Sequence, residues 1–311
     1  ISLENNFASA STLGLLTRKA VYRNGLGSVL ITKGYDANKK ELIPKRFTSN
    51  TLLAYPFGNK PQKDTLFNTI NYEKLDSAVS SIFENSHQTR AVLVLYKNQL
   101  IAERYAKGFT KESRILGWSM TKSILSTVFG IMQYQGKLSV QDRAPILEWE
   151  NDDRKKITLH NLLQMNSGLA WDENYEKISD VTKMLFLEDD MTKMQQKQQL
   201  VDSPNFSWNY SSGTSNLLSG ILRKKLGNQQ EYLDYWYREL IDKIGMNSMI
   251  VETDVKGHYV ASSYAWATAR DWAKFGLLYL HKGNWNGTQI FSPEWVDYIT
   301  QPTPTSNNSY G

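Results

Sequence analysis

This 311-residue chain lacks the residues that a zinc site, a membrane span or a nucleic-acid site would need. It has no cysteine and no His-Glu-x-x-His motif, and its four histidines are scattered, so we expect no zinc site. No apolar stretch approaches about 18 residues, so no segment is predicted to span a membrane. No basic run is interleaved with aromatic residues, which argues against nucleic acid as a partner. The composition, 41% hydrophobic and 22% charged, fits an enzyme with a large buried core.

Two common catalytic loops are also missing. The segment from Gly117 to Thr121 resembles a Gly-x-Ser-x-Gly nucleophile elbow but lacks its second glycine. The segment from Gly130 to Lys137 has one residue too many between its glycines for a phosphate-binding loop, and Leu138 stands where serine or threonine is needed. The sequence therefore predicts neither a nucleophile elbow nor a phosphate-binding loop.

What the chain does contain is a Ser-x-x-Lys motif at Ser119 and Lys122. Residues three apart on a helix share a face, so the lysine amine can reach the serine hydroxyl. A serine hydroxyl is a weak nucleophile until a neighbouring base takes its proton. The alternative interpretation is a serine that caps a helix, followed by a solvated lysine.

The surroundings of the motif favour catalysis. Residues 119–135 carry apolar side chains at helical spacing, and Gly136 is a good C-terminal stop. Upstream, residues 90–109 predict two strands joined at Lys97-Asn98-Gln99. Strands that feed a helix place Ser119 at the helix N-terminus, where the dipole and free N–H groups favour developing negative charge.

Four segments together resemble the serine hydrolases of the β-lactamase and penicillin-binding superfamily: residues 117–142, 157–175, 208–227 and 262–296. The resemblance covers roughly residues 90–300 in family order, and is nearest to class C β-lactamases, the esterases like them and 6-aminohexanoate-dimer hydrolases. It implies an α/β (α+β) fold, in which an antiparallel sheet flanked by helices adjoins a mostly helical domain. It also implies a bacterial protein of the periplasm or cell envelope, with the cytoplasm as the alternative.

The second motif of that family is Tyr-x-Asn, and Tyr210-Ser211-Ser212 occupies its place. The resemblance implies that the Tyr210 hydroxyl assists proton transfer, while Ser212 takes the position of an asparagine that contacts substrate. A literal match at Tyr22-Arg23-Asn24 precedes the nucleophile and fails on order. Ser179-Asp180-Val181 lacks an amide residue and is interpreted as a helix start.

The third motif of the family, Lys-Thr-Gly or His-Thr-Gly, does not occur. In the family it lies on a late strand whose backbone N–H completes the oxyanion hole. We expect the C-terminal strands to be missing because the sequence is a piece of a longer product. The alternative is a natural variant without those strands.

The chain is predicted to divide into four stretches. Residues 1–60 form an N-terminal extension that wraps the core, and residues 61–135 form the first part of the α/β domain, with the nucleophile helix. Residues 136–255 are mostly helical, and residues 256–311 return to the α/β domain, which stays incomplete. Helical periodicity predicts helices in 71–86, 181–200, 228–245 and 269–283.

Residues 167–176 are predicted to form a loop over a cleft between the domains. Tyr175 is a candidate for substrate binding, as are Trp171 and Asp172, whereas Trp118 is interpreted as a packing residue. The resulting hypothesis is a serine hydrolase that cleaves a small ester, amide or β-lactam through an acyl-enzyme, with no metal or cofactor. The alternative is a penicillin-binding-like or substrate-binding protein of the same fold with little turnover.

Overall fold

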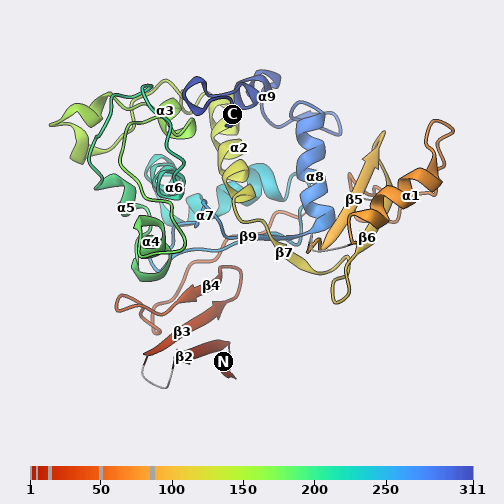
Figure 1. Cartoon of the computed structure of the whole chain (residues 1–311), viewed down its shortest axis with the longest axis horizontal. Coiled ribbons are helices and arrows are strands. Elements are labelled where there is room, and N and C mark those ends of the chain that lie inside the picture. The colour runs from red at the N-terminus through yellow and green to blue at the C-terminus, as the bar shows by residue number, and fades with distance from the viewer. Residues whose placement is uncertain (1, 5, 13–15, 49–51, 85–87, 311) are drawn as a thin grey trace.

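Helix α2 (Met120–Tyr134) stands at the centre of the molecule, with α8 (Ala269–Leu280) beside it and α9 (Pro293–Thr300) near its upper end (Figure 1). Its predicted apolar positions are all buried: Ile124, Leu125, Val128, Phe129, Ile131 and Met132. These side chains belong to the main hydrophobic core. The computed structural model describes residues 2–4, 6–12, 16–48, 52–84 and 88–310.

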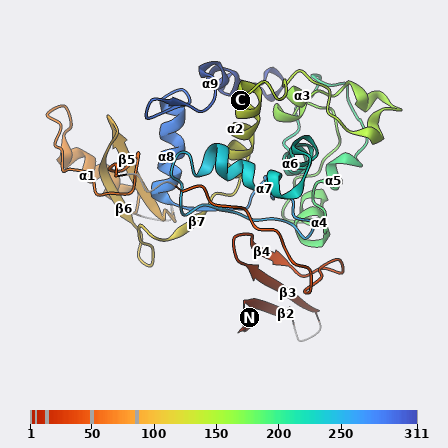
Figure 2. The same ribbon diagram turned by 180° about the vertical axis from the view of Figure 1, so that it is seen from behind.

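Of the remaining helices, α3 to α6 lie on the side of α2 opposite to α8, whereas α1 lies beyond α8 (Figure 1). Their bounds are α1 Tyr72–Ser81, α3 Leu159–Leu163, α4 Asp180–Leu187, α5 Lys193–Gln196, α6 Ser212–Leu226 and α7 Gln229–Trp236. A π-helical turn, Tyr237–Ile241, continues α7, and short 3-10 turns occur at Leu147–Trp149, Asp153–Lys156 and Pro304–Ser306. Seen from behind, α7 crosses the lower part of α2 (Figure 2). Among the described residues, no helix is both long and apolar enough to cross a membrane.

The described strands form small antiparallel sheets rather than one large sheet. Their order is β1-β2-β3-β4 in the N-terminal sheet, β7-β9-β8 below α2, and β5-β6 and β10-β11 as hairpins. Their bounds are β1 Ser2–Glu4, β2 Phe7–Thr12, β3 Leu16–Arg23, β4 Gly27–Leu30, β5 Ala91–Tyr96, β6 Gln99–Tyr105, β7 Arg114–Leu116, β8 Ile250–Val251, β9 Ala265–Thr268, β10 Asn284–Trp285 and β11 Thr288–Gln289. The predicted class, antiparallel strands combined with helices, is confirmed.

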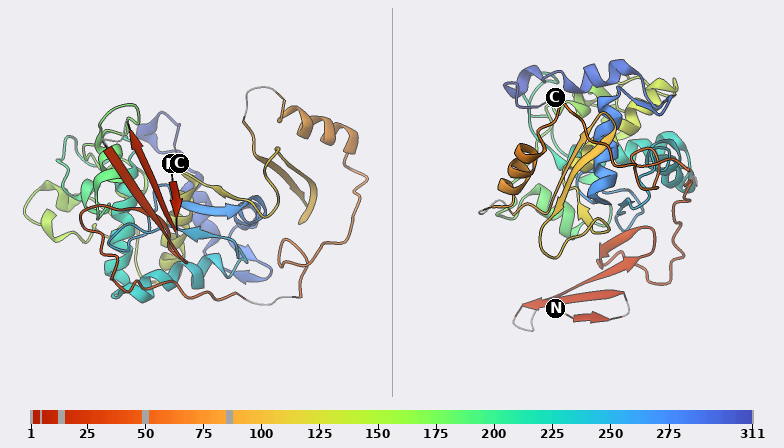
Figure 3. Two further views of the ribbon diagram at one scale, coloured as in Figure 1. Left: turned by 90° about the horizontal axis from the view of Figure 1, so that it is seen from below. Right: turned by 90° about the vertical axis from the view of Figure 1, so that its right-hand side faces the viewer.

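The N-terminal sheet lies apart from hairpin β5-β6 (Figure 3) and is joined to the rest of the protein by apolar packing of Val21 and Val29 against Val255 and by polar contacts. Arg23 of β3 donates to the Thr253 carbonyl at 2.5 Å, and the Ser28 N–H of β4 donates to the Glu252 carboxylate at 2.8 Å. These contacts attach the sheet beside β8. The proposed role of residues 1–60 as a wrapping extension stays a prediction.

Three helix predictions hold and one needs correction. Helices α1, α7 and α8 occupy the predicted segments 71–86, 228–245 and 269–283. The predicted helix over 181–200 is instead divided into α4 and α5. The chain turns between them because the Met191 N–H donates to the buried Asp254 carboxylate, a contact from a distant segment that periodicity does not reveal.

Candidate active site

The turn between β7 and α2 holds Ser119 in place. Gly117 donates its N–H to the Ala265 carbonyl at 2.8 Å, and a Cβ atom at Gly117 would lie 2.4 Å from the Trp272 ring. Trp118 follows with a φ of 45°, a left-handed conformation that is uncommon for a bulky residue and clusters at functional sites. Ser119 comes directly before α2, so its N–H belongs to the free donors of a helix N-terminus.

The Ser119 hydroxyl is engaged by the two predicted partners rather than by the helix. It makes no capping hydrogen bond to α2. It accepts hydrogen bonds from the Tyr210 hydroxyl at 2.8 Å and from the Lys122 Nζ at 3.2 Å. The alternative interpretation, a capping serine beside a solvated lysine, is therefore wrong. The structure brings Ser119, Lys122 and Tyr210 together.

Lys122 is only 9% exposed and sits among uncharged acceptors. Its Nζ donates to the Ser212 Oγ at 3.2 Å and to the Ser262 carbonyl at 2.8 Å, besides Ser119. Burial lowers the pKa of Lys122 from 10.5 to about 8, an effect that the negative charge of Glu173 opposes. The amine therefore loses its proton more readily than an ordinary lysine, as a general base requires.

Tyr210 faces Ser119 from the segment that precedes α6. Burial raises the pKa of its hydroxyl, so the phenol keeps its proton at neutral pH and can donate it. Its ring packs near Trp208 and Tyr310, with centroid distances of 6.2 and 6.1 Å. These contacts orient the hydroxyl toward the nucleophile.

Glu173 is the site residue that sequence reasoning missed. Its carboxylate accepts hydrogen bonds from the Ser212 N–H at 2.9 Å, the Ser212 Oγ at 2.5 Å and the Tyr175 hydroxyl at 2.8 Å. The Trp171 indole N–H donates to it as well. The signal in the sequence was an acidic residue two positions before Tyr175, inside the loop predicted to cover the cleft.

The two predicted substrate-binding residues have different surroundings. Ser212 is fully buried and contacts Lys122 and Glu173. Its hydroxyl supports the base, and its predicted contact with substrate stays a prediction. Tyr175 is 54% exposed, with its hydroxyl held by Glu173. Its role in substrate binding stays a prediction.

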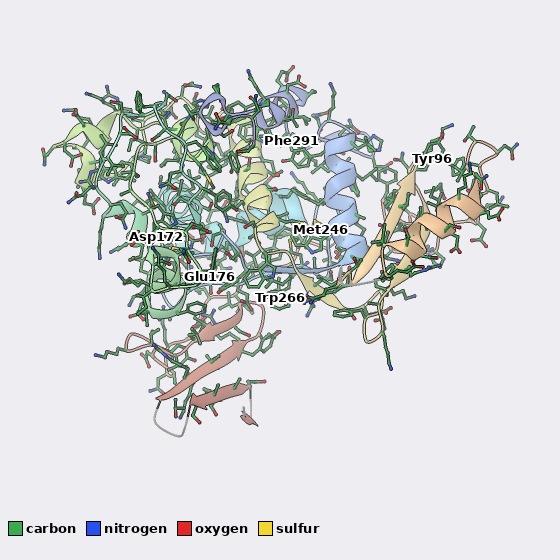
Figure 4. The ribbon with its side chains drawn as sticks, viewed as in Figure 1. Tyr96, Asp172, Glu176, Met246, Trp266 and Phe291 are labelled. Carbon is green, nitrogen blue, oxygen red and sulfur yellow. The ribbon has the colours of Figure 1, made fainter. Side chains whose placement is uncertain are left out.

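The sequence also drew attention to Trp171, Asp172 and Trp118. Trp171 is buried, and Asp172 pairs with Lys177 at 2.9 Å on the helical side of the molecule, where Figure 4 labels it. Neither contacts Ser119. Trp118 is 57% exposed and lies edge-on to Tyr264, with a centroid distance of 6.4 Å. Its prediction as a packing residue is wrong, because more than half of the side chain is exposed.

A cavity of about 290 Å³ opens beside the nucleophile. Ser119, Lys122 and Tyr210 form its polar end. Its remaining wall is largely apolar and aromatic and includes Leu163, Met165, Tyr298 and Tyr310. The cavity therefore offers a small molecule an apolar surface next to a nucleophile.

A separate cluster, Asp190, Asp254 and His258, has the chemistry of metal ligands but is occupied by its own contacts. The His258 Nδ1 lies 3.5 Å from both carboxylates, and the Arg223 guanidinium lies 2.9 Å from the other ring nitrogen. Asp254 also accepts backbone N–H groups from Lys256 and His258. The Arg223 guanidinium beside the cluster and the backbone hydrogen bonds to Asp254 fit a polar network that stabilises this turn.

Comparisons with known proteins find a family model and relatives that resemble this chain. The family described as Beta-lactamase matches residues 77–307. The 6-aminohexanoate-dimer hydrolase of Paenarthrobacter ureafaciens is 24% identical over 229 residues, covering 68% of this chain and 57% of the hydrolase. A Bacillus anthracis structure provisionally assigned the same name has a TM-score of 0.62 and 23% identity, covering 73% of this chain and 62% of its own. A family VIII carboxylesterase has a TM-score of 0.59 and 14% identity, covering 75% of both chains. The chain thus spans little more than half the length of the curated relative.

Proposed function

Because the chain belongs to the Beta-lactamase family, we propose that it is a serine hydrolase that cleaves an ester or amide bond of a small molecule through an acyl-enzyme on Ser119. The observation that carries this proposal is that the Ser119 hydroxyl contacts both Lys122 and Tyr210. A nucleophile, its base and a second proton donor within hydrogen-bond reach are what covalent acyl transfer requires.

In the acylation step, neutral Lys122 takes the hydroxyl proton of Ser119 while the Ser119 oxygen attacks the substrate carbonyl carbon. The carbonyl oxygen becomes an oxyanion, and the Ser119 N–H at the start of α2 supplies one stabilising donor. Tyr210 donates its proton to the leaving oxygen or nitrogen as the bond to carbon breaks. The Lys122 ammonium then returns a proton to the Tyr210 oxygen.

In the deacylation step, water attacks the acyl-enzyme with the same residues managing its proton. The water oxygen bonds to the acyl carbon, the bond to the Ser119 oxygen breaks, and Ser119 recovers its proton as the acid leaves. The cavity beside Ser119, about 290 Å³, suits a small molecule. Esters, linear amides and β-lactams are the substrate classes to compare.

Labelling with a fluorescent fluorophosphonate, followed by peptide mass spectrometry, tests the proposal. We expect one adduct, on the peptide that contains Ser119, and none in Ser119→Ala. The matched control is Ser123→Ala, because Ser123 lines the same cavity on the same helix and should leave labelling intact. An unlabelled wild-type protein, or equal labelling of Ser119→Ala, would overturn the proposal.

Turnover separates the hydrolase from its alternative. Incubation with p-nitrophenyl butyrate, a linear oligoamide and a penicillin should release product from at least one of them many times per active site. A stable adduct on Ser119 with no further release would instead indicate a penicillin-binding-like protein with little turnover.

A further inference from the structure

Glu173 is half-buried, and both oxygens of its carboxylate accept hydrogen bonds from the protein. One of its oxygens accepts from the Ser212 hydroxyl and from Tyr175, and the other accepts from the Ser212 N–H and from Trp171. Ser212 is the first residue of α6, so the carboxylate also lies at a helix N-terminus. With both oxygens used in this way, Glu173 is placed to act on its neighbours rather than on a substrate.

The hydrogen-bond directions around Ser212 follow from this arrangement. A carboxylate cannot donate, so the Ser212 hydroxyl must give its proton to Glu173, at 2.5 Å. The Ser212 oxygen then presents only lone pairs to the Lys122 Nζ, which lies 3.2 Å away. The Ser262 carbonyl, at 2.8 Å from the same nitrogen, is also an acceptor alone.

A neutral lysine amine has two N–H groups and one lone pair. Ser212 and Ser262 are the two neighbours of Lys122 that can only accept, so they take the two N–H groups. The direction that remains is the one toward Ser119, at 3.2 Å. The lone pair that must remove the nucleophile's proton is thereby aimed at it.

We propose that Glu173 is a positioning residue for the hydrolase: by holding the proton of Ser212, it directs the lone pair of Lys122 to Ser119. This inference rests on the proposed function, because it takes Lys122 as the base. Without the carboxylate, the Ser212 hydroxyl can turn and donate its proton to the lone pair of neutral Lys122. The amine is then a worse base for Ser119.

Glu173 has a second effect, through its charge. In the described part of the chain, Lys122 faces two titratable side chains, Glu173 from the loop before α4 and Tyr210 from the loop before α6. Tyr210 is uncharged at neutral pH, so Glu173 supplies the anion. Its negative charge raises the pKa of Lys122 against the larger opposite effect of burial. Removing the charge should therefore lower the pKa of Lys122.

A double-mutant cycle on p-nitrophenyl butyrate hydrolysis tests the orientation. Glu173→Gln keeps the size of the side chain and should lower kcat about ten- to a hundredfold, within the contribution of a positioned base, with little change in KM. Ser212→Ala removes the hydroxyl that would quench the base. In that background, Glu173→Gln should therefore change kcat by only about twofold or less. Trp171→Phe removes another contact of Glu173 and should affect kcat far less than Glu173→Gln.

An effect of Glu173→Gln that is equally large with and without the Ser212 hydroxyl would overturn the proposal, since Glu173 would then only hold its loop. Thermal melting of each variant checks that it is folded at the temperature of the assay.

A titration of Lys122 by NMR, with ¹³C-labelled lysine, tests the same residue without turnover. The Lys122→Arg spectrum assigns the resonance. We expect the titration midpoint of Lys122 to move to lower pH in Glu173→Gln and to stay in place in Trp171→Phe. An unchanged midpoint in Glu173→Gln would contradict the proposal. This measurement addresses Glu173 even if the wild-type protein hydrolyses none of the substrates, an outcome that would count against the proposed function alone.

Discussion

Two buried lysines in this molecule have opposite surroundings. Lys274 of α8 is 2% exposed and forms an ion pair with Asp271 at 3.1 Å, with the Gly245 carbonyl and Asn59 as further acceptors. Lys122 of α2 is 9% exposed, and each of its acceptors is uncharged. Its anion, Glu173, is reached through Ser212.

The difference shows how a fold assigns a buried amine to structure or to chemistry. A directly paired carboxylate compensates part of the cost of burying an amine, so Lys274 can tie α8 to the segment before β8. Neutral acceptors compensate it less, so the amine of Lys122 tends toward its neutral form. A base that is neutral near physiological pH is useful beside a nucleophile, and Ser119 is the neighbour that Lys122 has and Lys274 lacks.

The largest effect should come from removing the Ser119 hydroxyl, from which Lys122 takes a proton. Ser119→Ala is expected to lower kcat for p-nitrophenyl butyrate by about 10⁴-fold or more, because the acyl-enzyme can no longer form. The substitution deletes one oxygen, so the melting temperature should stay near that of the wild type. The wild-type protein provides the kinetic baseline. Near-normal hydrolysis by Ser119→Ala would mean that the region of Lys122 is structural, like that of Lys274.

The next largest effect distinguishes two roles of Lys122: accepting a proton as a base, and supplying a positive charge. Lys122→Arg keeps a positive charge, but a guanidinium stays protonated and cannot accept a proton. We expect acylation by p-nitrophenyl butyrate to slow by at least about a hundredfold. The rate is measured as the release of nitrophenol in a stopped-flow experiment. A variant that acylates as fast as the wild type would reduce Lys122 to an electrostatic role and leave Tyr210 as the candidate base, which Tyr210→Phe then tests.

The third effect concerns stability and should appear at the other lysine. Lys274→Met leaves the buried carboxylate of Asp271 without its cation, which typically costs about 3–5 kcal/mol of unfolding free energy. Lys122→Met should cost less, because only uncharged groups lose a partner. Urea denaturation of both variants makes the comparison. Folded Lys274→Met should keep a kcat close to that of the wild type, and equal destabilisation by the two substitutions would remove the distinction between the sites.

Local features of the sequence predicted much of this site. The apolar spacing of 119–135 gave α2, and residues three apart on a helix necessarily share a face, which places Lys122 beside Ser119. The assignment of Tyr210 came from its order in the family resemblance. Each of these inferences depended on short spacings or on motif order, which the chain displays directly.

The remaining features depend on contacts that no spacing reveals. Glu173 and Ser212 are 39 residues apart, and their pairing needs a loop without periodicity to meet the start of α6. The same contact explains why Ser212 is buried. The sequence is interpreted to give Trp118 a packing role, but its backbone enters a left-handed turn that only the surrounding strands determine.

The smallest effect is the pH dependence of hydrolysis, which should depend on Lys122 and not on Lys274. Burial lowers the pKa of Lys122 to about 8, so below that pH the amine carries a proton and cannot accept one from Ser119. We expect kcat/KM for p-nitrophenyl butyrate to fall about tenfold per unit as the pH drops below about 8, and to level off above it. In Lys274→Met the same midpoint should be found, because Lys274 takes no part in the proton transfer. A profile that is flat between pH 6 and about 9 would show that Lys122 does not titrate during acylation, and the two lysines would then differ in their packing alone.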